Sequence, residues 1–239
     1  MPVDLQRAQG RNNNVSVLHY APRRPRGVTI VAAHGYSSSK HNLDALCGFL
    51  SSHGFDVFSL DFPGHKLGAS GGTLRGMEDC VDAMQAVIAH ARAQSEQPVV
   101  LLGHSMGAMT AIFTGALDPG VRAVIAIATG YGRPSALAAM RNAGTIDFRH
   151  SYVDGVDLQT LVADLDAWYE RSLPKLEGRP LLFIGASRDA MVSPSSVRSL
   201  YDHAPEPKSL VTIESDHTFA GEHARGEVLE WLNPLFPRA

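Results

Sequence analysis

Continuous apolar runs alternate with amphipathic segments along most of the chain. Short runs rich in β-branched and aromatic residues cover residues 28–33, 55–60, 99–102, 121–128, 180–185 and 210–213. Runs that are apolar at every position are typical of strands buried on both faces of a parallel sheet. Between them, apolar residues recur at helical spacing over residues 41–52, 77–94, 106–115, 157–170, 195–202 and 222–232. A further strand over 15–20 is expected at an edge, as one arm of a hairpin.

This rhythm predicts an α/β fold with a mostly parallel central sheet and helices on both faces. The alternation breaks after residue 129 and resumes near residue 180. No internal repeat or low-complexity linker divides the chain. We therefore expect one domain over residues 1–239, with residues 130–156 forming a short lid insertion over one edge.

Composition narrows the class of protein. The chain has 239 residues, 44% of them apolar, and a formal net charge of −3, so nothing favours nucleic acid or an anionic membrane as a partner. A small cluster of Arg23, Arg24 and Arg26 is expected to be a solvated turn. Cys47 and Cys80 lie in predicted helices and are expected to be small core residues in a reducing compartment. With no signal-peptide pattern and no apolar run near the ~18 residues of a membrane span, the sequence predicts a soluble cytoplasmic protein.

The pattern Gly-x-Ser-x-Gly stands at residues 103–107, between a predicted strand and a predicted helix. In that setting Ser105 lies at the tip of a strained turn, with the helix N-terminus behind it. The two glycines allow a tight turn and a close approach of strand and helix. The motif predicts that Ser105 is a nucleophile.

A serine nucleophile needs a base, and the base needs an acid that orients it. In parallel sheets, ligands bind at the carboxyl ends of the strands, so partners are expected just after strands. His217 follows the last predicted strand and is the expected base, with His223 as its rival. Asp189 follows the preceding strand and is the expected acid, although it could instead cap the next helix. Asp216 is discounted because side chains adjacent in sequence rarely face each other.

The oxyanion formed during acyl transfer needs fixed N–H donors. The backbone N–H groups of Met106, next to the nucleophile, and of Tyr36, after the strand 28–33, are the expected donors. The Tyr36 ring is expected either to wall the acyl pocket or simply to pack.

These residues resemble the α/β-hydrolase superfamily over essentially the whole chain. His34-Gly35-Tyr36 resembles its His-Gly-aromatic oxyanion motif, and the order Ser105, Asp189, His217 is the order of its triad. Residues 61–65, with Ser-Gly-Gly behind them at 70–72, resemble its Asp-x-x-Gly-His-Gly-x-Ser loop, except that Lys-Leu-Gly at 66–68 replaces the short glycine spacing. Within the superfamily the chain is most similar to small bacterial carboxylesterases of the cinnamoyl/feruloyl esterase type and to monoacylglycerol lipases.

The resemblance implies a serine hydrolase that cleaves carboxylic esters through an acyl-enzyme on Ser105. A short lid suggests short-chain acyl or small aryl esters, with no metal or organic cofactor and a small-molecule partner only. Thioesterase, C–C bond hydrolase and acyltransferase activities would use the same triad and stay open, as does the choice between monomer and homodimer. Four lid-side aromatic residues could line the pocket or pack the lid onto the domain: Tyr131, Phe148, Tyr152 and Trp168.

Overall fold

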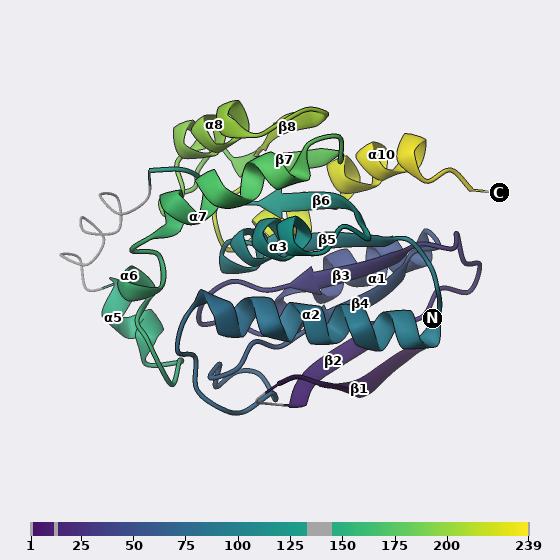
Figure 1. The fold of residues 1–239 in the computed structure, drawn as a ribbon, viewed down its shortest axis with the longest axis horizontal. Coiled ribbons are helices and arrows are strands. Elements are labelled where there is room, and N and C mark those ends of the chain that lie inside the picture. The colour runs from purple at the N-terminus through teal and green to yellow at the C-terminus, as the bar shows by residue number, and fades with distance from the viewer. Residues whose placement is uncertain (1, 12–13, 133–144, 239) are drawn as a thin grey trace.

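An eight-stranded sheet runs through the middle of the molecule (Figure 1). The computed structural model describes residues 2–11, 14–132 and 145–238. The strands lie in the order β1-β2-β4-β3-β5-β6-β7-β8; β2 is antiparallel to both β1 and β4, and every other neighbouring pair is parallel. Their bounds are β1 (Val3–Gln9), β2 (Asn14–Tyr20), β3 (Thr29–Ala33), β4 (Asp56–Leu60), β5 (Val99–His104), β6 (Val121–Ile127), β7 (Leu181–Ala186) and β8 (Lys208–Ile213).

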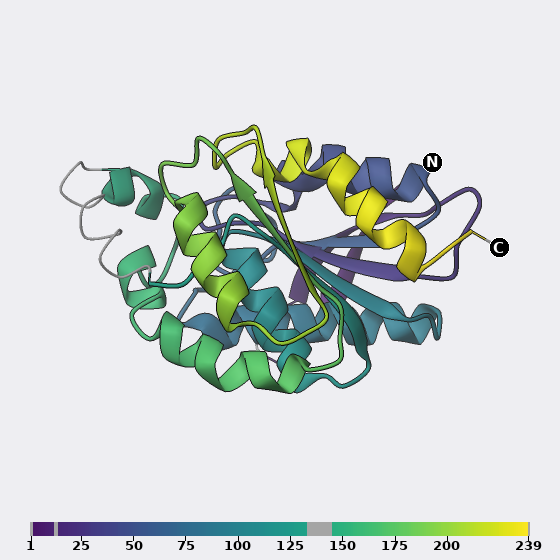
Figure 2. The same cartoon turned by 90° about the horizontal axis from the view of Figure 1, so that it is seen from above.

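Helices cover both faces of this sheet, as the view from above shows (Figure 2). One layer holds α2, α3, α7 and α8, and the other holds α1, α9 and α10. The α-helices are α1 (Asp44–Ser52), α2 (Met77–Gln94), α3 (Met106–Leu117), α5 (Thr145–His150), α6 (Leu158–Leu161), α7 (Leu165–Ser172), α8 (Pro194–His203), α9 (Ala220–His223) and α10 (Arg225–Leu235). Two 3₁₀ helices, η1 (Lys40–Leu43) and η2 (Leu173–Leu176), complete the described elements.

The central strands are apolar at successive positions because both of their faces are buried. In β3, Val31 and Ala33 belong to the core under α2 and α3, whereas Ile30 and Ala32 belong to the core under α1 and α10. All five residues of β3 are buried. This two-sided burial confirms the predicted α/β class, with a mostly parallel sheet between two helical layers.

The helix predicted over 157–170 is two helices. The side chain of Asp157 accepts a hydrogen bond from the backbone N–H of Thr160 and starts α6. The backbone then leaves helical geometry at Val162 (φ −105°, ψ 8°), and α7 begins at Leu165. The periodic apolar pattern runs through the break because both helices bury the same side, so periodicity alone does not reveal it.

The predicted lid insertion lies partly outside the described residues, which omit 133–144. Its described part contains α5 and a segment, residues 150–156, that pairs with the loop after β4. Val153 bridges His65, and Gly155 bridges Leu74. A Cβ on Gly155 would lie 1.9 Å from the Leu74 carbonyl oxygen, so the two backbones meet closely. The extent of the lid and the single-domain division stay predictions.

The structure also bears on the two cysteines and on the search for a membrane-spanning helix. Cys47 in α1 and Cys80 in α2 are free thiols and fully buried. Across the described ranges, none of the helices combines the length and apolar character needed to cross a bilayer.

Candidate active site

Ser105 occupies the sharp turn between β5 and α3. Its backbone has φ 55° and ψ −114°, a conformation that residues with a side chain rarely adopt. The turn is held on both sides: the Ser105 N–H donates to the Ile127 carbonyl at 2.8 Å, and the Ser105 carbonyl accepts from Ala108 N–H at 3.0 Å. The strand, the strained turn and the helix therefore stand as the Gly-x-Ser-x-Gly pattern predicts.

The two glycines of the motif are required by sterics. A Cβ on Gly103 would lie 2.0 Å from the carbonyl oxygen of Gly107. A Cβ on Gly107 would lie 2.1 Å from the carbonyl oxygen of Ala33 in β3. Both contacts involve backbone atoms, which cannot rotate away, so only glycine lets α3 start this close to β5 and β3.

Ser105, His217 and Asp189 form one hydrogen-bonded chain. His217 Nε2 lies 3.1 Å from Ser105 Oγ, and His217 Nδ1 lies 2.7 Å from Asp189 Oδ2. The three come from the ends of β5, β7 and β8, and each side chain is largely buried. A carboxylate that accepts from Nδ1–H leaves Nε2 free to accept the hydroxyl proton. The rival His223 bonds Ser215 Oγ instead.

The surroundings of Asp189 favour its ionised form. Its second oxygen, Oδ1, accepts the backbone N–H groups of Met191 at 2.8 Å and Val192 at 2.7 Å. Burial acts to raise the pKa of the carboxyl, but the hydrogen bond and charge of His217, with the two N–H donors, hold it below its ordinary value. The carboxylate can therefore orient His217 and stabilise its positive charge.

His104 is a second buried histidine of the site, and no feature of the Gly-x-Ser-x-Gly pattern indicates its contacts. Its Nε2–H donates to the backbone carbonyl of His217 at 2.7 Å, and the two rings lie 5.0 Å apart between centroids. Burial, with the charge of nearby His217, lowers the pKa of His104 to about 3, so the ring is neutral. It holds the loop that carries His217.

The loop after β3 lies directly against Ser105. A Cβ on Gly35 would lie 3.2 Å from Ser105 Cβ and 3.3 Å from His104 Nδ1, so a larger residue would crowd the site. Tyr36 follows Gly35, and Met106 follows Ser105 as the first residue of α3. The two backbones expected to supply the oxyanion donors thus flank Ser105.

His34 fixes this loop from inside. Its Nδ1–H donates to the Gly35 carbonyl at 2.7 Å, and its Nε2 accepts the Phe62 N–H at 3.1 Å. The side chain is completely buried, and burial is the main cause that lowers its pKa to about 3. A neutral ring with one donor and one acceptor therefore ties the loop after β3 to the loop after β4.

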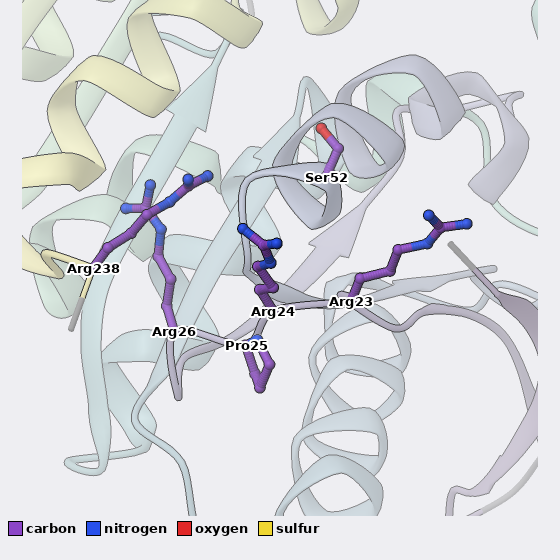
Figure 3. Close-up of a pocket in the computed structure, with 6 residues that line it drawn as sticks. All are labelled: Arg23, Arg24, Pro25, Arg26, Ser52 and Arg238. Atoms are coloured by element: carbon purple, nitrogen blue, oxygen red, sulfur yellow. The ribbon is translucent and has the colours of Figure 1, made fainter.

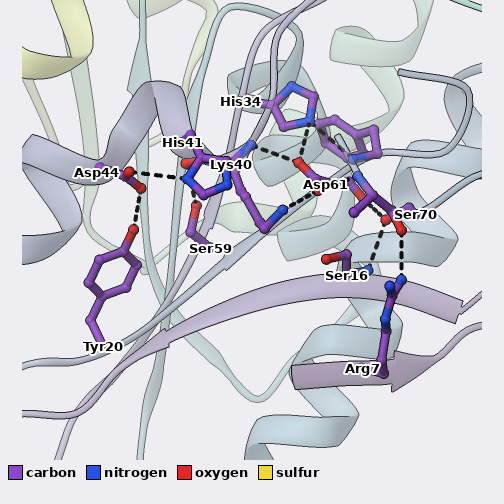
Figure 4. Close-up of polar contacts among 12 residues, drawn as sticks. Arg7, Ser16, Tyr20, His34, Lys40, His41, Asp44, Ser59, Asp61 and Ser70 are labelled. Carbon is purple, nitrogen blue, oxygen red and sulfur yellow. Dashed lines mark hydrogen bonds and ion pairs between the residues drawn. The ribbon is translucent and has the colours of Figure 1, made fainter. Parts of the chain in front are cut away.

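A buried carboxylate, Asp61, joins the same two loops (Figure 4). It accepts from Lys40 Nζ at 2.5 Å, from Lys40 N–H at 2.8 Å and from Ala69 N–H at 2.8 Å. Ser70 Oγ donates to the Asp61 carbonyl at 2.7 Å. The loop that resembles the Asp-x-x-Gly-His motif therefore has a positioning role, because it anchors the segment next to Ser105.

A cavity of about 180 Å³ opens over Ser105 and His217. Its other lining residues come from the loop after β3 and η1, the end of β5, α5 and α6, and the loops after β4, β7 and β8: Gly35, Tyr36, Ser37, Ser38, Asn42, Leu67, His104, Arg149, Leu158, Met191 and Thr218. Tyr36 has a buried ring, and its hydroxyl bonds the Val156 carbonyl and His150 Nδ1, each at 2.9 Å.

The other four aromatic residues expected at the pocket do not line this cavity. Phe148 is 66% exposed and lies edge-on to Tyr152. Tyr131 stacks on His203, and its hydroxyl donates to a carboxylate oxygen on α7. Trp168 packs against α3 and so matches the alternative expectation, packing onto the domain. In the sequence, an aromatic residue that lines the pocket looks the same as one that packs the lid onto the domain.

A larger hollow, of about 550 Å³, lies near the start of β3, at the end of that strand away from Ser105 (Figure 3). The described residues that line it include no histidine or carboxylate that could activate a nucleophile. Arg26 Nε and Arg238 NH2 both donate to the His53 carbonyl, at 2.7 and 3.2 Å, and hold the segment after α10 against the end of α1. The lining residues are Arg23, Arg24, Pro25, Arg26, Ser52 and Arg238. The candidate active site is therefore the smaller cavity, whose lining includes Ser105 and His217.

No group of three or more histidine, cysteine, aspartate or glutamate side chains that could hold a metal ion occurs within residues 2–11, 14–132 and 145–238. Around Ser105, hydrogen bonds join His217 to Asp189 and to Ser105, and join His104 to the His217 carbonyl.

Comparison with known proteins identifies the family of this chain. Residues 23–155, more than half of the chain, match the family described as serine aminopeptidase, S33 (Hydrolase_4). The chain therefore belongs to this family, a group of serine hydrolases with the α/β-hydrolase fold. It is 28% identical over 207 residues to the uncharacterized protein YfhR of Escherichia coli O157:H7, which covers 84% of this chain and 66% of that protein. The chain thus spans slightly less than two thirds of this relative's length.

Solved structures share the fold over nearly the whole chain. The esterase domain of a Rhodothermus marinus protein is 20% identical, with a TM-score of 0.71 and 98% of each chain covered. XC6422 from Xanthomonas campestris, described as an α/β serine hydrolase without lid, is 19% identical, with a TM-score of 0.72 and coverage of 100% and 98%. The thioesterase domain of the curacin biosynthetic pathway is 14% identical, with a TM-score of 0.67 and coverage of 97% and 99%.

Proposed function

We propose that this chain hydrolyses carboxylic esters of small acids or small aryl acids through an acyl-enzyme on Ser105. The observation that carries the proposal is the chain of hydrogen bonds from Asp189 through His217 to Ser105, at 2.7 and 3.1 Å, on the wall of a cavity. A Ser-His-Asp chain of this kind activates a hydroxyl that is otherwise a poor nucleophile at neutral pH.

The proposed reaction has two halves. In the first, Ser105 Oγ attacks the ester carbonyl while His217 Nε2 takes the hydroxyl proton, and the carbonyl oxygen becomes an oxyanion held by the N–H groups of Tyr36 and Met106. The C–O bond to the alcohol then breaks, and His217 returns the proton to the leaving alcohol. In the second half His217 takes a proton from water, the hydroxide attacks the acyl-enzyme, and the acid leaves as Ser105 regains its proton.

The size of the cavity supports a small substrate. At about 180 Å³ it is smaller than the roughly 300–1,000 Å³ typical of pockets for drug-sized ligands. Arg149 in α5 and Leu158 in α6, on either side of the segment that pairs with the loop after β4, contribute to the wall of this space. We therefore expect turnover to fall, rather than rise, with acyl chains beyond about twelve carbons, because a cavity this small buries only a short chain.

Aminopeptidase activity, which the family description suggests, is less well supported. An aminopeptidase has to bind a free ammonium group, and burying that charge needs a carboxylate partner. The described residues that line the cavity include no aspartate or glutamate. Thioester hydrolysis, C–C bond cleavage and acyl transfer would use the same three residues and differ only in the group that enters or leaves.

Substitution of the nucleophile tests the proposal. Ser105→Ala should abolish hydrolysis of p-nitrophenyl acetate and butyrate and remove labelling by a fluorophosphonate, with an unchanged far-UV circular dichroism spectrum. Ser38→Ala is the matched control, because Ser38 lines the same cavity but has no bond to His217. Turnover by Ser105→Ala equal to that of the wild type would refute the assignment. A panel of acyl-CoA thioesters, vinylogous diketones and added alcohols then separates the alternative reactions.

A further inference from the structure

The lining of the cavity carries a positive charge that the proposed hydrolytic chemistry does not use. Arg149, near the end of α5, lines the cavity together with Ser105 and His217. Apart from Arg149 and the two histidines, the described lining residues are neutral. They are one glycine, one tyrosine, five side chains that carry a hydroxyl or an amide, two leucines and one methionine. No carboxylate within the described residues comes within ion-pair distance of Arg149.

The segment that carries Arg149 is held over the cavity. Its neighbour His150 bonds the Tyr36 hydroxyl through Nδ1 at 2.9 Å, and the same hydroxyl donates to the Val156 carbonyl at 2.9 Å. Beyond α5, Asp154 N–H donates to the Gly64 carbonyl at 2.8 Å. The guanidinium is therefore presented from an anchored segment, which reduces the conformational entropy lost when it binds a ligand.

The charge of Arg149 also acts on the reactive end of the cavity. It is one of the charges that disfavour protonation of His104, whose ring lies 5.0 Å from the ring of His217. A substrate that fills a small cavity removes water from any guanidinium in its wall. That desolvation is unfavourable unless the substrate itself supplies an anion.

We propose that Arg149 selects esters that carry a second, anionic group, such as the free carboxylate of a dicarboxylic acid monoester. This inference rests on the proposed ester hydrolysis at Ser105 and names its substrate class. A planar guanidinium binds a carboxylate through two parallel hydrogen bonds, which fixes both the charge and the orientation of the substrate. The same positive charge repels a substrate ammonium group, in agreement with a described lining that contains no aspartate or glutamate.

The test compares charged and neutral esters of nearly equal size. Monoethyl glutarate against ethyl pentanoate places the charge on the acyl side, and O-acetyl glycolate against ethyl acetate places it on the alcohol side. Acid release is followed in a pH-stat, which needs no chromophore. Fluorophosphonate labelling in parallel reports the reactivity of Ser105 independently of substrate charge.

For the wild type we expect kcat/KM for at least one anionic ester to exceed that of its neutral partner about 10- to 100-fold, the range expected for a charged hydrogen bond. Arg149→Gln should remove this preference by raising KM for the anionic ester, with a much smaller effect on the neutral ester and with fluorophosphonate labelling of Ser105 retained. Added salt should weaken the preference in the wild type. Arg171→Gln, which removes an exposed arginine on α7 outside the cavity lining, is the matched control.

Two results would overturn the inference while the proposed ester hydrolysis stands. One is a wild type that cleaves neutral esters at least as well as anionic ones, with no change of this ratio in Arg149→Gln. The other is an equal loss on both kinds of ester, which would mean that Arg149 acts on the oxyanion. If fluorophosphonate labels neither protein and no ester is cleaved, the proposed function itself fails.

Discussion

The buried ion pair between Lys40 and Asp61 provides a sharp test of what holds the loops beside the nucleophile. The side chains are 3% and 0% exposed, and Nζ lies 2.5 Å from Oδ2. Lys40→Met keeps the unbranched stem and removes the charge. Breaking a buried pair from one side costs roughly 3–5 kcal/mol, because it leaves an uncompensated charge. Two backbone N–H donors, from Lys40 itself and Ala69, still bond the carboxylate, so we expect the lower end, about 3 kcal/mol.

Urea unfolding followed by circular dichroism measures this loss, with the slope against denaturant compared between proteins so that a change in midpoint can be read as stability. Arg188→Met is the matched control. Arg188 pairs with Glu214 at 2.8 Å, but these side chains are 63% and 81% exposed. An exposed pair contributes at most about 1 kcal/mol, so the control should unfold nearly like the wild type.

The dependence on pH separates a charge effect from a packing effect. Burial acts to raise the pKa of Asp61, but the bonds from Lys40 and the loop outweigh it and hold the pKa below its ordinary value. This contribution to wild-type stability is therefore present above the unfolded pKa, near pH 4, and is lost as the pH falls through the lower folded value. Without Lys40, burial prevails and raises the pKa, so the variant gains stability as the pH falls through that raised value.

The gap between wild type and Lys40→Met should therefore narrow from about pH 7 to about pH 4. A penalty below about 1 kcal/mol at neutral pH would show that the Lys40 charge does not compensate Asp61. A large penalty that stays constant with pH would point to lost packing.

Two further substitutions probe the turn and the base. Gly107→Ala should lower the free energy of unfolding by at least about 2 kcal/mol and abolish fluorophosphonate labelling, because its Cβ would collide with the backbone of β3. Gly226→Ala in α10, with open space around its Cβ, should instead raise the free energy of unfolding by up to about 1 kcal/mol. Thermal unfolding compares the two variants. A Gly107→Ala melting temperature equal to that of the wild type would contradict the steric argument. Asp189→Asn should lower kcat on p-nitrophenyl butyrate on the order of 10³-fold or more, since an amide donating to Nδ1 favours the wrong tautomer of His217, and near wild-type turnover would exclude that orienting role.

The sequence predicted those parts of the molecule whose signal is local. Buried parallel strands are apolar at every position, so β3, β5, β6 and β7 could be located within a few residues. The position of reactive residues just after strands was enough to bring Ser105, Asp189 and His217 together, because a parallel sheet places its strand ends on one edge.

The parts that sequence reasoning missed depend on contacts between distant segments. His104 is inside the serine motif, yet its bond to the His217 carbonyl spans 113 positions of the chain. Lys40 reads as a surface residue, and only the pairing with Asp61 explains its burial. Arg149 falls in the lid, where no periodic pattern indicates which side chains face the cavity. For the same reason, the sequence shows that aromatic residues occur there but not which way their side chains point.

The backbone of Ser105 limits how stable this chain can become. A residue with a side chain at φ 55° and ψ −114° stores of order 1–3 kcal/mol of strain, which glycine would largely avoid. A chain optimised for stability alone would therefore carry glycine at position 105, and it would lose the hydroxyl. Heat resistance and reactivity depend on the same residue in opposite directions. Thermostable variants of this protein should be sought in the helices and sheet that hold the turn, with the strained serine left in place.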